Sequence, residues 1–351
     1  MTPAHDLQAS VIVVTWNGRE RLAESLPAIV GQQHVRHEVI LVDNGSTDGT
    51  AEWVRESHPS VRLVELSENT GFAAGNNRGF EAARAPLVAT INNDAISDPD
   101  WLAGLVRGAA AHPDAGMFAS RMVYLHDPDV IDSAGISLDP LGIAWDRGAG
   151  TPVRDDDERI VFGASAGAAL YRRELLEATG GFDERFFAYL EDVDLAWRAR
   201  WLGWTAHYVP AARVRHRHSA TWAEDSPLKT YHLGRNKVWL IAKNYPLGPL
   251  LRWLPLILAY DAASLPVTVW RQRSLAAVRG RLAGLARLTE IWKSRAHIAS
   301  ARRAPRATAG SESAEPRSAA TWSELRDVME PLRSPLAIWC RHRRLRRALR
   351  Q

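Results

Sequence analysis

The chain has 351 residues, a formal net charge of +4 and 46% hydrophobic residues, and it contains 14 Trp. This length and composition exclude a small disulfide-stapled scaffold and a disordered protein, and they favour one large α/β unit with a C-terminal addition. The single cysteine, Cys340, excludes an internal disulfide and a zinc site built from several thiolates, which fits a reducing cytoplasmic setting.

The N-terminal region predicts an alternating α/β structure. Its first ten residues lack the basic start of a secretory signal, so we expect the body of the protein to stay in the cytoplasm. β-branched runs alternate with stretches of helical spacing, which predicts a β-α-β-α order with a mostly parallel sheet flanked by helices. The predicted strands are residues 11–15, 39–42, 61–64 and 87–91.

Polar segments follow three of these predicted strands, at residues 16–18, 43–50 and 92–94. Each segment alone is typical of a turn, because Asn, Asp, Gly and Ser are the common turn residues. Ligands of parallel sheets bind beyond the carboxyl ends of the strands. Three polar segments at that edge therefore favour a binding site.

Acidic residues crowd the start of a predicted helix in the segment GGFDERFFAYLEDVDLAWRARWLGW. They are Glu191, Asp192 and Asp194. An acid in a first helical turn contributes about 0.3 to 1 kcal/mol, which is a structural reason for one of them. Three acids beside apolar residues exceed that need and favour a carboxylate held at the wall of a cleft.

The run of residues 253–270 is strongly apolar, but it is only 18 residues long and contains Pro255, Asp261 and Pro266. A membrane span needs about 20 predominantly apolar residues. We therefore expect this run to insert shallowly into a membrane interface or to pack on the body of the protein, since its tryptophans suit either place.

The C-terminal part of the chain is basic. Residues 271–351 hold 19 Lys and Arg against 6 Asp and Glu, a net +13, so residues 1–270 carry −9. Residues 302–320 have the composition of a disordered linker, and a capping box at residues 321–324 predicts that order resumes in a helix. Six arginines between residues 341 and 350 would supply about 1 kcal/mol each near an anionic membrane leaflet. A solvated tail that only aids solubility is the alternative.

The motifs VIVVTWNG, VDNGSTDGT, NTGFAAGNN, INNDA, GGFDERFFAYLEDVDL and HRHSAT, in this order over about residues 9–246, resemble family 2 glycosyltransferases, especially bacterial rhamnosyltransferase-like members. The resemblance implies a GT-A fold, with a Rossmann-like nucleotide-binding half and an acceptor-binding half. It also implies a nucleotide-sugar donor, a divalent metal and inversion at the anomeric carbon. The expected division is a glycosyltransferase domain at 1–246, membrane-associating helices at 247–301, the linker at 302–320 and a basic amphipathic tail at 321–351.

By this resemblance, Asp94 matches the last acid of the DxD motif and would bind Mg²⁺ or Mn²⁺. The sequence departs from the motif because Asn92 and Asn93 fill its other two positions, so the metal needs a further ligand. His216, in the segment similar to HxxSxT, is predicted to supply it. A cation is required there, because two like charges 4 Å apart cost about 4 kcal/mol at an effective dielectric of 20.

The resemblance also assigns the other site residues. Asp43 would bind the pyrimidine base of the donor, and Asp192 would be the general base, with Glu191 as the next candidate; such a base is typically worth 10²–10⁴-fold in rate. The other expected donor contacts are Thr15, Trp16, Asn17, Asn69, Gly71, Asn76, Asn92 and Asn93. The expected acceptor-side residues are Gly163, Ser165, Gly167 and Trp197.

The predicted function is transfer of L-rhamnose from dTDP-rhamnose to a cell-envelope or polyprenyl-linked glycan by an enzyme held peripherally at the inner membrane face. UDP-sugars would suit Asp43 equally well. A sugar nucleotidyltransferase is one alternative, but it would want a glycine-rich basic loop where Trp16, Asn17 and Gly18 stand. An inactive scaffold that binds a membrane or nucleic acid is another; it gives no reason for the acidic site residues, and we expect no nucleic-acid partner.

Overall fold

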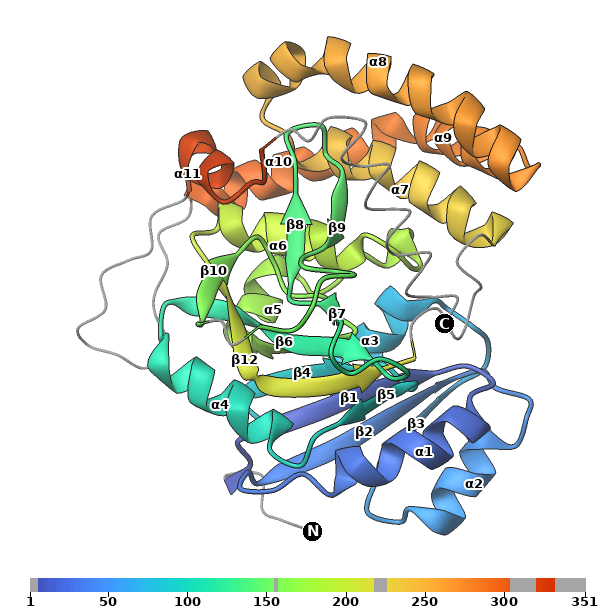
Figure 1. Cartoon of the computed structure of the whole chain (residues 1–351), viewed down its shortest axis with the longest axis vertical. Coiled ribbons are helices and arrows are strands. Elements are labelled where there is room, and N and C mark those ends of the chain that lie inside the picture. Colours follow the sequence, from blue (N-terminus) through green and yellow to red (C-terminus); the bar gives the residue numbers. More distant parts are fainter. Residues whose placement is uncertain (1–5, 155–156, 218–225, 304–319, 332–351) are drawn as a thin grey trace.

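The computed structural model describes residues 6–154, 157–217, 226–303 and 320–331 (Figure 1). A ten-stranded sheet lies at its centre, with the main strand order β10-β12-β6-β11-β4-β1-β2-β3. The strands β5 and β7 pair with β12 and β6 beside this path. A separate hairpin joins β8 (Ile136–Leu138) and β9 (Ala144–Asp146).

The N-terminal half of the sheet is parallel, as predicted. Strand β1 lies between β2 and β4, and β3 pairs with the other side of β2. The helices that connect these strands alternate with them along the chain. The elements are β1 (Ala9–Thr15), α1 (Arg19–Val30), β2 (His37–Asn44), α2 (Thr50–Ser57), β3 (Arg62–Leu66), α3 (Phe72–Ala82) and β4 (Leu87–Ile91).

The sheet changes direction beyond β4. Strand β11 (Ala168–Arg172) runs antiparallel to both β4 and β6 (Ala115–Tyr124), and β12 (Thr205–His216) runs parallel to β6. The end of β12 pairs with β5 (Ala95–Ser97), which follows the carboxyl end of β4. The remaining elements of this half are α4 (Trp101–Ala111), β7 (Ile131–Ser133), β10 (Arg159–Val161), α5 (Arg173–Thr179), the 3₁₀ turn η2 (Glu184–Phe186) and α6 (Glu191–Trp201).

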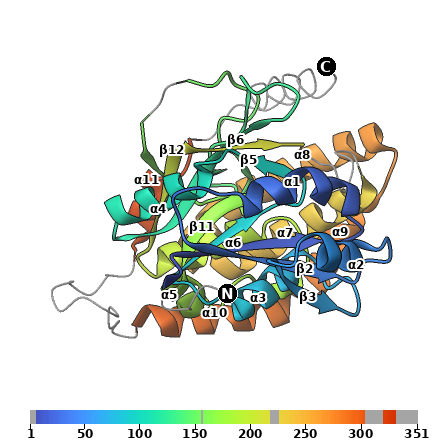
Figure 2. The same cartoon turned by 90° about the horizontal axis from the view of Figure 1, so that it is seen from below.

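Two hydrophobic cores lie on opposite faces of the sheet. One contains Leu22 of α1 and Leu102 of α4, and the other contains Ala73 of α3, Leu175 of α5 and Trp239. Figure 2 shows α1 and α4 on one side of the sheet and α3 and α5 on the other. Alternate residues of the strands feed the two cores, which is why these strands read as continuous apolar runs.

The C-terminal helices form a layer over one end of the body (Figure 1). They are α7 (Pro227–Asn244), α8 (Leu247–Gln272), α9 (Ala276–Ala286), α10 (Leu288–Arg303) and α11 (Trp322–Asp327). The predicted capping box is confirmed, since Thr321 and Glu324 exchange hydrogen bonds at the start of α11. The expected linker, from residue 304 to 319, and the arginines after residue 331 lie outside the described residues.

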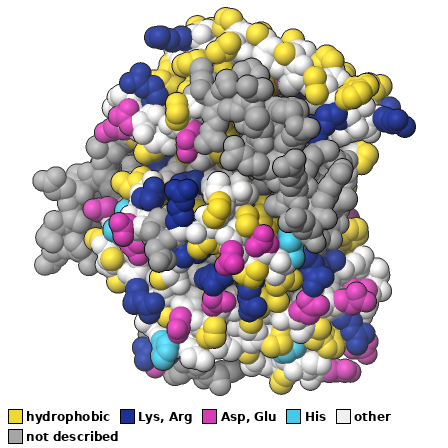
Figure 3. All heavy atoms as spheres, in the orientation of Figure 1, with side chains coloured by type: hydrophobic (Ala, Val, Ile, Leu, Met, Phe, Trp, Pro, Cys, Tyr) yellow, Lys and Arg dark blue, Asp and Glu magenta, His cyan; other side chains and the backbone are white. Residues whose placement is uncertain are grey.

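Helix α8 is the one described helix that is long and apolar enough to cross a membrane, judged by length and composition only. It runs through Pro255 and Pro266 and is longer than the predicted apolar run. Its Asp261 faces the body and pairs with Lys237 of α7 at 2.9 Å and with Arg281 of α9 at 3.1 Å. Hydrophobic side chains gather on the outer face of the molecule over α8 (Figure 3). The large exposed ones on this helix are Leu247, Leu251, Leu256, Leu258, Val267 and Trp270.

Candidate functional site

The predicted polar segments meet at one edge of the sheet, where β1, β2 and β4 end. Thr15 and Asp43 are register partners at the ends of β1 and β2. The side-chain amide of Asn93, just after β4, donates to Thr15 Oγ1 at 2.8 Å. The three strand ends therefore form one continuous surface, as the parallel order requires.

The turn after β1 is held against the turn after β2. Asn17 has a positive φ of 47°, its backbone N–H donates to Ser46 Oγ, and its side-chain oxygen accepts from the N–H of Thr47 at 2.8 Å. The buried Asp43 accepts from the N–H of Ser46 at 3.1 Å. Trp16 stands at the rim, 37% exposed. The ends of the neighbouring strands β1 and β2 therefore carry an exposed aromatic residue and a buried carboxylate, two groups that suit a nucleoside.

The residues before α3 are bonded mainly to one another. Asn69 Oδ1 accepts from the side-chain amide of Asn44 and from the N–H of Gly71, both at 3.0 Å. Gly71 has a φ of 92°, and a Cβ there would fall 2.6 Å from the carbonyl oxygen of Phe187. Asn76 donates to the carbonyl oxygen of Phe72 within α3. Only glycine permits this approach between α3 and the segment that precedes α6.

Asp94 and His216 are brought together by the pairing of β5 with β12. Asp94 Oδ1 lies 3.2 Å from His216 Nε2, and His216 Nδ1 lies 2.6 Å from Asp132 Oδ2. Burial lowers the pKa of His216, but its hydrogen bonds to Asp132 and Asp94 outweigh burial and raise the pKa to about 10. The side-chain amide of Asn92 lies 3.3 Å from His216 Nε2. His218, Ser219 and Thr221 of the same motif lie outside the described residues.

The Asp94 carboxylate and His216 Nε2 could together hold a divalent cation, provided that the cation displaces the proton that Nε2 shares with Asp94. No group of three or more His, Cys, Asp or Glu side chains suited to a metal ion occurs within the described ranges, so phosphate and water oxygens would have to complete the coordination. Mg²⁺ is commonly held in this way, by one or two carboxylates together with substrate phosphates. The Asp132 carboxylate on the other ring nitrogen is a typical outer partner of a metal-binding histidine.

Asp192 lies in the first turn of α6 and is half-buried, while its neighbour Glu191 is buried. Burial raises the pKa of Asp192 to about 6, although the N–H of Ala166, 3.2 Å from its Oδ2, acts in the opposite direction. Burial, together with the charge of Asp192, raises the pKa of Glu191 well above its usual range. Glu191 Oε2 has no hydrogen-bond partner among the described residues. Burial therefore disfavours ionisation of both carboxyl groups, and the charge of Asp192 disfavours it further at Glu191.

One short segment joins the predicted base to the predicted metal ligands. The N–H of Ala166 donates to Asp192, and the carbonyl oxygen of Ala166 accepts from Thr90 Oγ1 at 2.8 Å. The next carbonyl oxygen, of Gly167, accepts from the N–H of Asn92 at 2.9 Å. Asp192 and the Asn92–His216 pair thus lie on the two sides of residues 166 and 167.

The structure places Trp197 in the core, apart from the other predicted acceptor-side residues. Trp197 is fully buried, with its ring edge-on to Phe162 and Tyr245, so it is a core residue with no open face for an acceptor. Gly163 is a close-packing position, since a Cβ there would lie 2.4 Å from Ala196. Gly167 adjoins Asn92 as described above, and Ser165 is half-buried one residue before Ala166.

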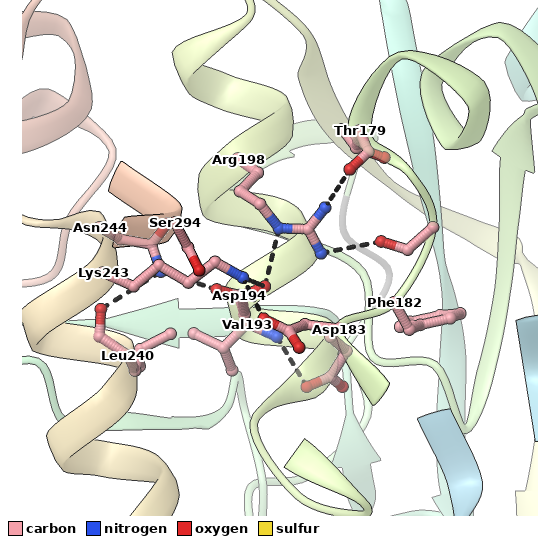
Figure 4. Close-up of polar contacts among 12 residues, drawn as sticks. Thr179, Phe182, Asp183, Val193, Asp194, Arg198, Leu240, Lys243, Asn244 and Ser294 are labelled. Carbon is pink, nitrogen blue, oxygen red and sulfur yellow. Dashed lines mark hydrogen bonds and ion pairs between the residues drawn. The ribbon is translucent and has the colours of Figure 1, made fainter. Parts of the chain in front are cut away.

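Asp194, the third acid of the crowded turn, is a structural residue (Figure 4). It is fully buried and pairs with Arg198 at 2.7 Å and with Lys243 and Asn244 of α7 at 2.8 Å. Burial raises the pKa of Asp194, but Lys243 and Arg198 outweigh burial and lower it. This ionic cluster holds α6 against α7, and it explains one of the three acids without a role in chemistry.

Sequence reasoning did not find Asp132 or Asn236. Asp132 is a single acid in a short strand, and only the pairing of β7 with β6 brings it near His216. Asn236 lies in the middle of α7 and contacts the segment before α6. Nothing in the local pattern distinguishes either residue, because their partners are distant in the sequence.

Comparisons with known proteins identify the family of the chain. Residues 10–180 match the family model "Glycosyl transferase family 2". A curated relative, the N-acetylglucosaminyl-diphospho-decaprenol L-rhamnosyltransferase of Mycobacterium tuberculosis, is 32% identical over 250 residues, which cover 63% of this chain and 80% of the relative.

Solved structures show the same fold. The mannosyltransferase PcManGT from Pyrobaculum calidifontis, in complex with GDP-Man and Mn²⁺, aligns with a TM-score of 0.51 and 23% identity over 84% of this chain and 85% of its own. TarS of S. aureus aligns with a TM-score of 0.52 and 18% identity over 84% of this chain and 53% of its own. The chain therefore belongs to glycosyltransferase family 2 and is a GT-A enzyme that uses a nucleotide-sugar donor.

Proposed function

We propose that the protein transfers L-rhamnose from dTDP-L-rhamnose, with inversion, to a hydroxyl group of a glycan carried on a polyprenyl diphosphate. The observation that carries this proposal is the placement of Asp192 and the Asp94–His216 pair around residues 166 and 167. The printed name of the Mycobacterium tuberculosis relative, which is 32% identical, supports the choice of rhamnose and of a lipid-linked acceptor.

Asp192 is the proposed general base. The acceptor oxygen forms a bond to the anomeric carbon while the bond from that carbon to the diphosphate breaks, and the hydroxyl proton passes to the Asp192 carboxylate. The diphosphate leaves with the bonding electron pair. A base with a pKa of about 6 suits this task, because it is ionised at neutral pH and still accepts a proton readily. Glu191 is the second candidate, and its raised pKa makes it the weaker one.

Asp94 and His216 are the proposed metal ligands, and Asp132 would hold the His216 ring in place. When bound, Mg²⁺ or Mn²⁺ would neutralise charge on the departing diphosphate. Asn92 would contact the ribose or a metal-bound water. Manganese in the PcManGT complex supports a divalent cation for this fold.

The donor nucleoside is proposed to bind at the ends of β1 and β2, with its base bound by Asp43 and lying beside the Trp16 side chain. Thr15, Asn17 and Asn93 shape this surface through the hydrogen bonds described above. Asn69, Gly71 and Asn76 would border the nucleotide from α3. Gly163, Ser165 and Gly167 would border the acceptor.

A thermal-shift panel with UDP, dTDP and GDP, each with and without Mn²⁺, tests the donor site. A ligand that binds the folded state raises the melting temperature. We expect a manganese-dependent rise with dTDP, a rise of similar size with UDP, and a smaller one with GDP. Absence of a metal-dependent shift with every nucleotide would reject the donor site, whereas a preference for GDP would reject only the pyrimidine assignment.

The proposed location is the inner face of the cell membrane, with the enzyme attached peripherally through residues 247–301 and the basic tail at 321–351. The exposed apolar face of α8 supports this proposal. Asp261 ties α8 to α7 and α9, so the helix would lie along the membrane surface with its outer face in the lipid. Residues 1–246 would then form the catalytic domain.

A further inference from the structure

The backbone just before Asp192 adopts an unusual conformation. Three residues without glycine's freedom have positive φ angles within four positions of the chain, a region that L-residues rarely adopt. They are Phe187 at 64°, Tyr189 at 71° and Leu190 at 65°. Leu190 is the residue on which α6 begins, and its carbonyl oxygen accepts the N–H of Asp194 at 2.9 Å. The start of α6, and with it the orientation of Asp192, depends on this conformation.

A single buried side chain holds the carbonyl groups of this segment. Asn236 of α7 is fully buried, and its amide nitrogen lies 3.0 Å from the carbonyl oxygen of Phe186, 2.9 Å from that of Ala188 and 2.7 Å from that of Tyr189. An amide group has only two N–H donors, so the three oxygens share them. The positive φ angles of this segment let the carbonyl groups of residues 186, 188 and 189 all point toward Asn236 in α7.

Neighbouring contacts fix the two flanks of the segment. Arg235 donates to the carbonyl oxygen of Arg185 at 3.1 Å and to that of Phe186 at 2.8 Å. On the opposite side, the carbonyl oxygen of Phe187 accepts from the N–H of Ala73 in α3 at 3.1 Å. The segment is therefore held between α7 and the helix that borders the proposed donor site.

We propose that Asn236 is a positioning residue for the reaction: by holding residues 186–189 it starts α6 at Glu191 and keeps Asp192 against Ala166. This inference rests on the proposed role of Asp192 as the base. The hydrogen bonds of Asn236 to described residues go to the backbone of residues 186–189 and to Arg235, so its effect on Asp192 passes through the backbone. Losing it lets the segment relax toward ordinary φ angles and moves the Asp192 carboxylate.

Hydrogen exchange measures this displacement without any substrate. The N–H of Ala166 donates to Asp192, so the peptide of residues 163–168 reports the position of the carboxylate. In Asn236→Ala we expect amide exchange in this peptide to be at least about tenfold faster than in the wild type. The matched control is Lys237→Met, on the next residue of α7, which removes an ion pair to Asp261 and does not contact the segment. It should leave this peptide within about twofold of the wild type.

Kinetics separates positioning from simple loss of stability. With dTDP-rhamnose and a short-chain N-acetylglucosaminyl-diphospho-polyprenol, well below the melting temperature, Asn236→Ala should lower kcat on the order of 10- to 100-fold. The dissociation constant for dTDP with Mn²⁺ should change less than about threefold. Lys237→Met should lower the melting temperature with kcat unchanged.

The possible results divide clearly. Unchanged exchange at residues 163–168 in Asn236→Ala, or equal acceleration in both variants, overturns the inference. If Asn236→Ala does not fold, Arg235→Met removes the hydrogen bonds to the carbonyl oxygens of residues 185 and 186 and the one to Asn236 Oδ1, while keeping most of the aliphatic volume. It must show the same pattern at smaller amplitude. Normal turnover of Asp192→Asn together with faster exchange in Asn236→Ala would instead reject the base and leave the positioning contact intact.

Discussion

At the scale of single residues, three neighbouring acids at the start of α6 differ in how their surroundings shift their pKa values. Lys243 and Arg198 lower the pKa of Asp194. The pKa of Glu191 is raised well above its usual range because it is buried beside Asp192, whose own pKa burial raises to about 6. Environments that push the pKa values of adjacent carboxyl groups apart commonly mark the acid and base of an enzyme. Asp192 alone combines access to solvent with a pKa close to neutrality.

The first prediction concerns pH. A general base must be ionised, so transfer should decline as the pH falls through the pKa of Asp192, about 6. We expect the acidic limb of the kcat profile, measured from pH 4.5 to 8.5 with saturating donor and metal, to have its midpoint near pH 6. A midpoint near pH 4 would mean that the group responsible is an ordinary exposed carboxyl rather than Asp192.

The same burial costs stability. Because the pKa of Asp192 is raised from 3.8 to about 6, the folded state favours the protonated form, and stability is lost as the pH rises from about 3.8 to about 6. Asp192→Asn removes this cost. At pH 8 the unfolding free energy of the variant should therefore be about 1 to 3 kcal/mol higher than that of the wild type, with a higher melting temperature. Below pH 3.8 the difference should vanish, because the carboxyl is then protonated in both the folded and the unfolded protein. Calorimetry at both pH values checks the sign.

Some site residues could be predicted from the sequence and others could not. Asp43 and Asp94 lie in the polar segments after predicted strands, so local order places them at the edge of the sheet. Asp192 lies in an acidic first helical turn, and its role as the base is assigned by the family resemblance. Asp132 and Asn236 act through contacts made only by tertiary pairing. Trp197 lies five residues after Asp192, and on a helix that spacing turns the side chain away toward the core.

At the scale of elements, the parallel strands follow directly from β-branched runs separated by helical stretches. The antiparallel placement of β11 has no such local signal, yet it brings Ala166 and Gly167 beside Asn92. Helix α8 extends beyond the apolar run of residues 253–270 because it starts at Leu247, with Gly248 and Pro249 in a first turn that tolerates proline.

The exposed outer face of α8 supports the proposed attachment to the membrane, which a pair of substitutions can test. Leu258 and Val267 are 59% and 54% exposed, and glutamate at both positions would place charge in the lipid. We expect Leu258→Glu/Val267→Glu to bind vesicles of anionic phospholipid at least about tenfold more weakly, since burying one such side chain contributes about 1.5 to 3 kcal/mol. Ile160→Glu, at a 53% exposed position on β10, is the matched control. Equal binding by the double variant and the control would show that α8 does not enter the membrane.

At the scale of the whole molecule, the charge is divided between an acidic body and a basic C-terminal part. Residues 1–270 carry −9 and include the acids of the site, whereas residues 271–351 carry +13. The net charge of +4 conceals this division. An acidic body that binds an anionic donor depends on a cation at the site, and a basic C-terminal part suits an anionic membrane.

Removing the basic tail tests whether the C-terminal charge attracts the protein to an anionic membrane. A chain that ends at residue 301 should retain the salt-resistant binding to vesicles that α8 provides and lose the salt-sensitive part, because exposed charges are screened within about 8 Å at physiological ionic strength. Sedimentation with anionic vesicles at low and high salt separates the two parts. Full salt-sensitive binding by the shortened chain would assign the electrostatic attraction to the body.

The most direct test of the account is turnover by Asp192→Asn. With dTDP-rhamnose, Mn²⁺ and the polyprenyl-linked acceptor, we predict that kcat falls on the order of 10²-fold or more while the affinity for dTDP stays within about threefold of the wild type. Glu177→Gln, an exposed acid-to-amide change on α5, should behave as the wild type. Turnover by Asp192→Asn close to that of the wild type would contradict the assignment of the base.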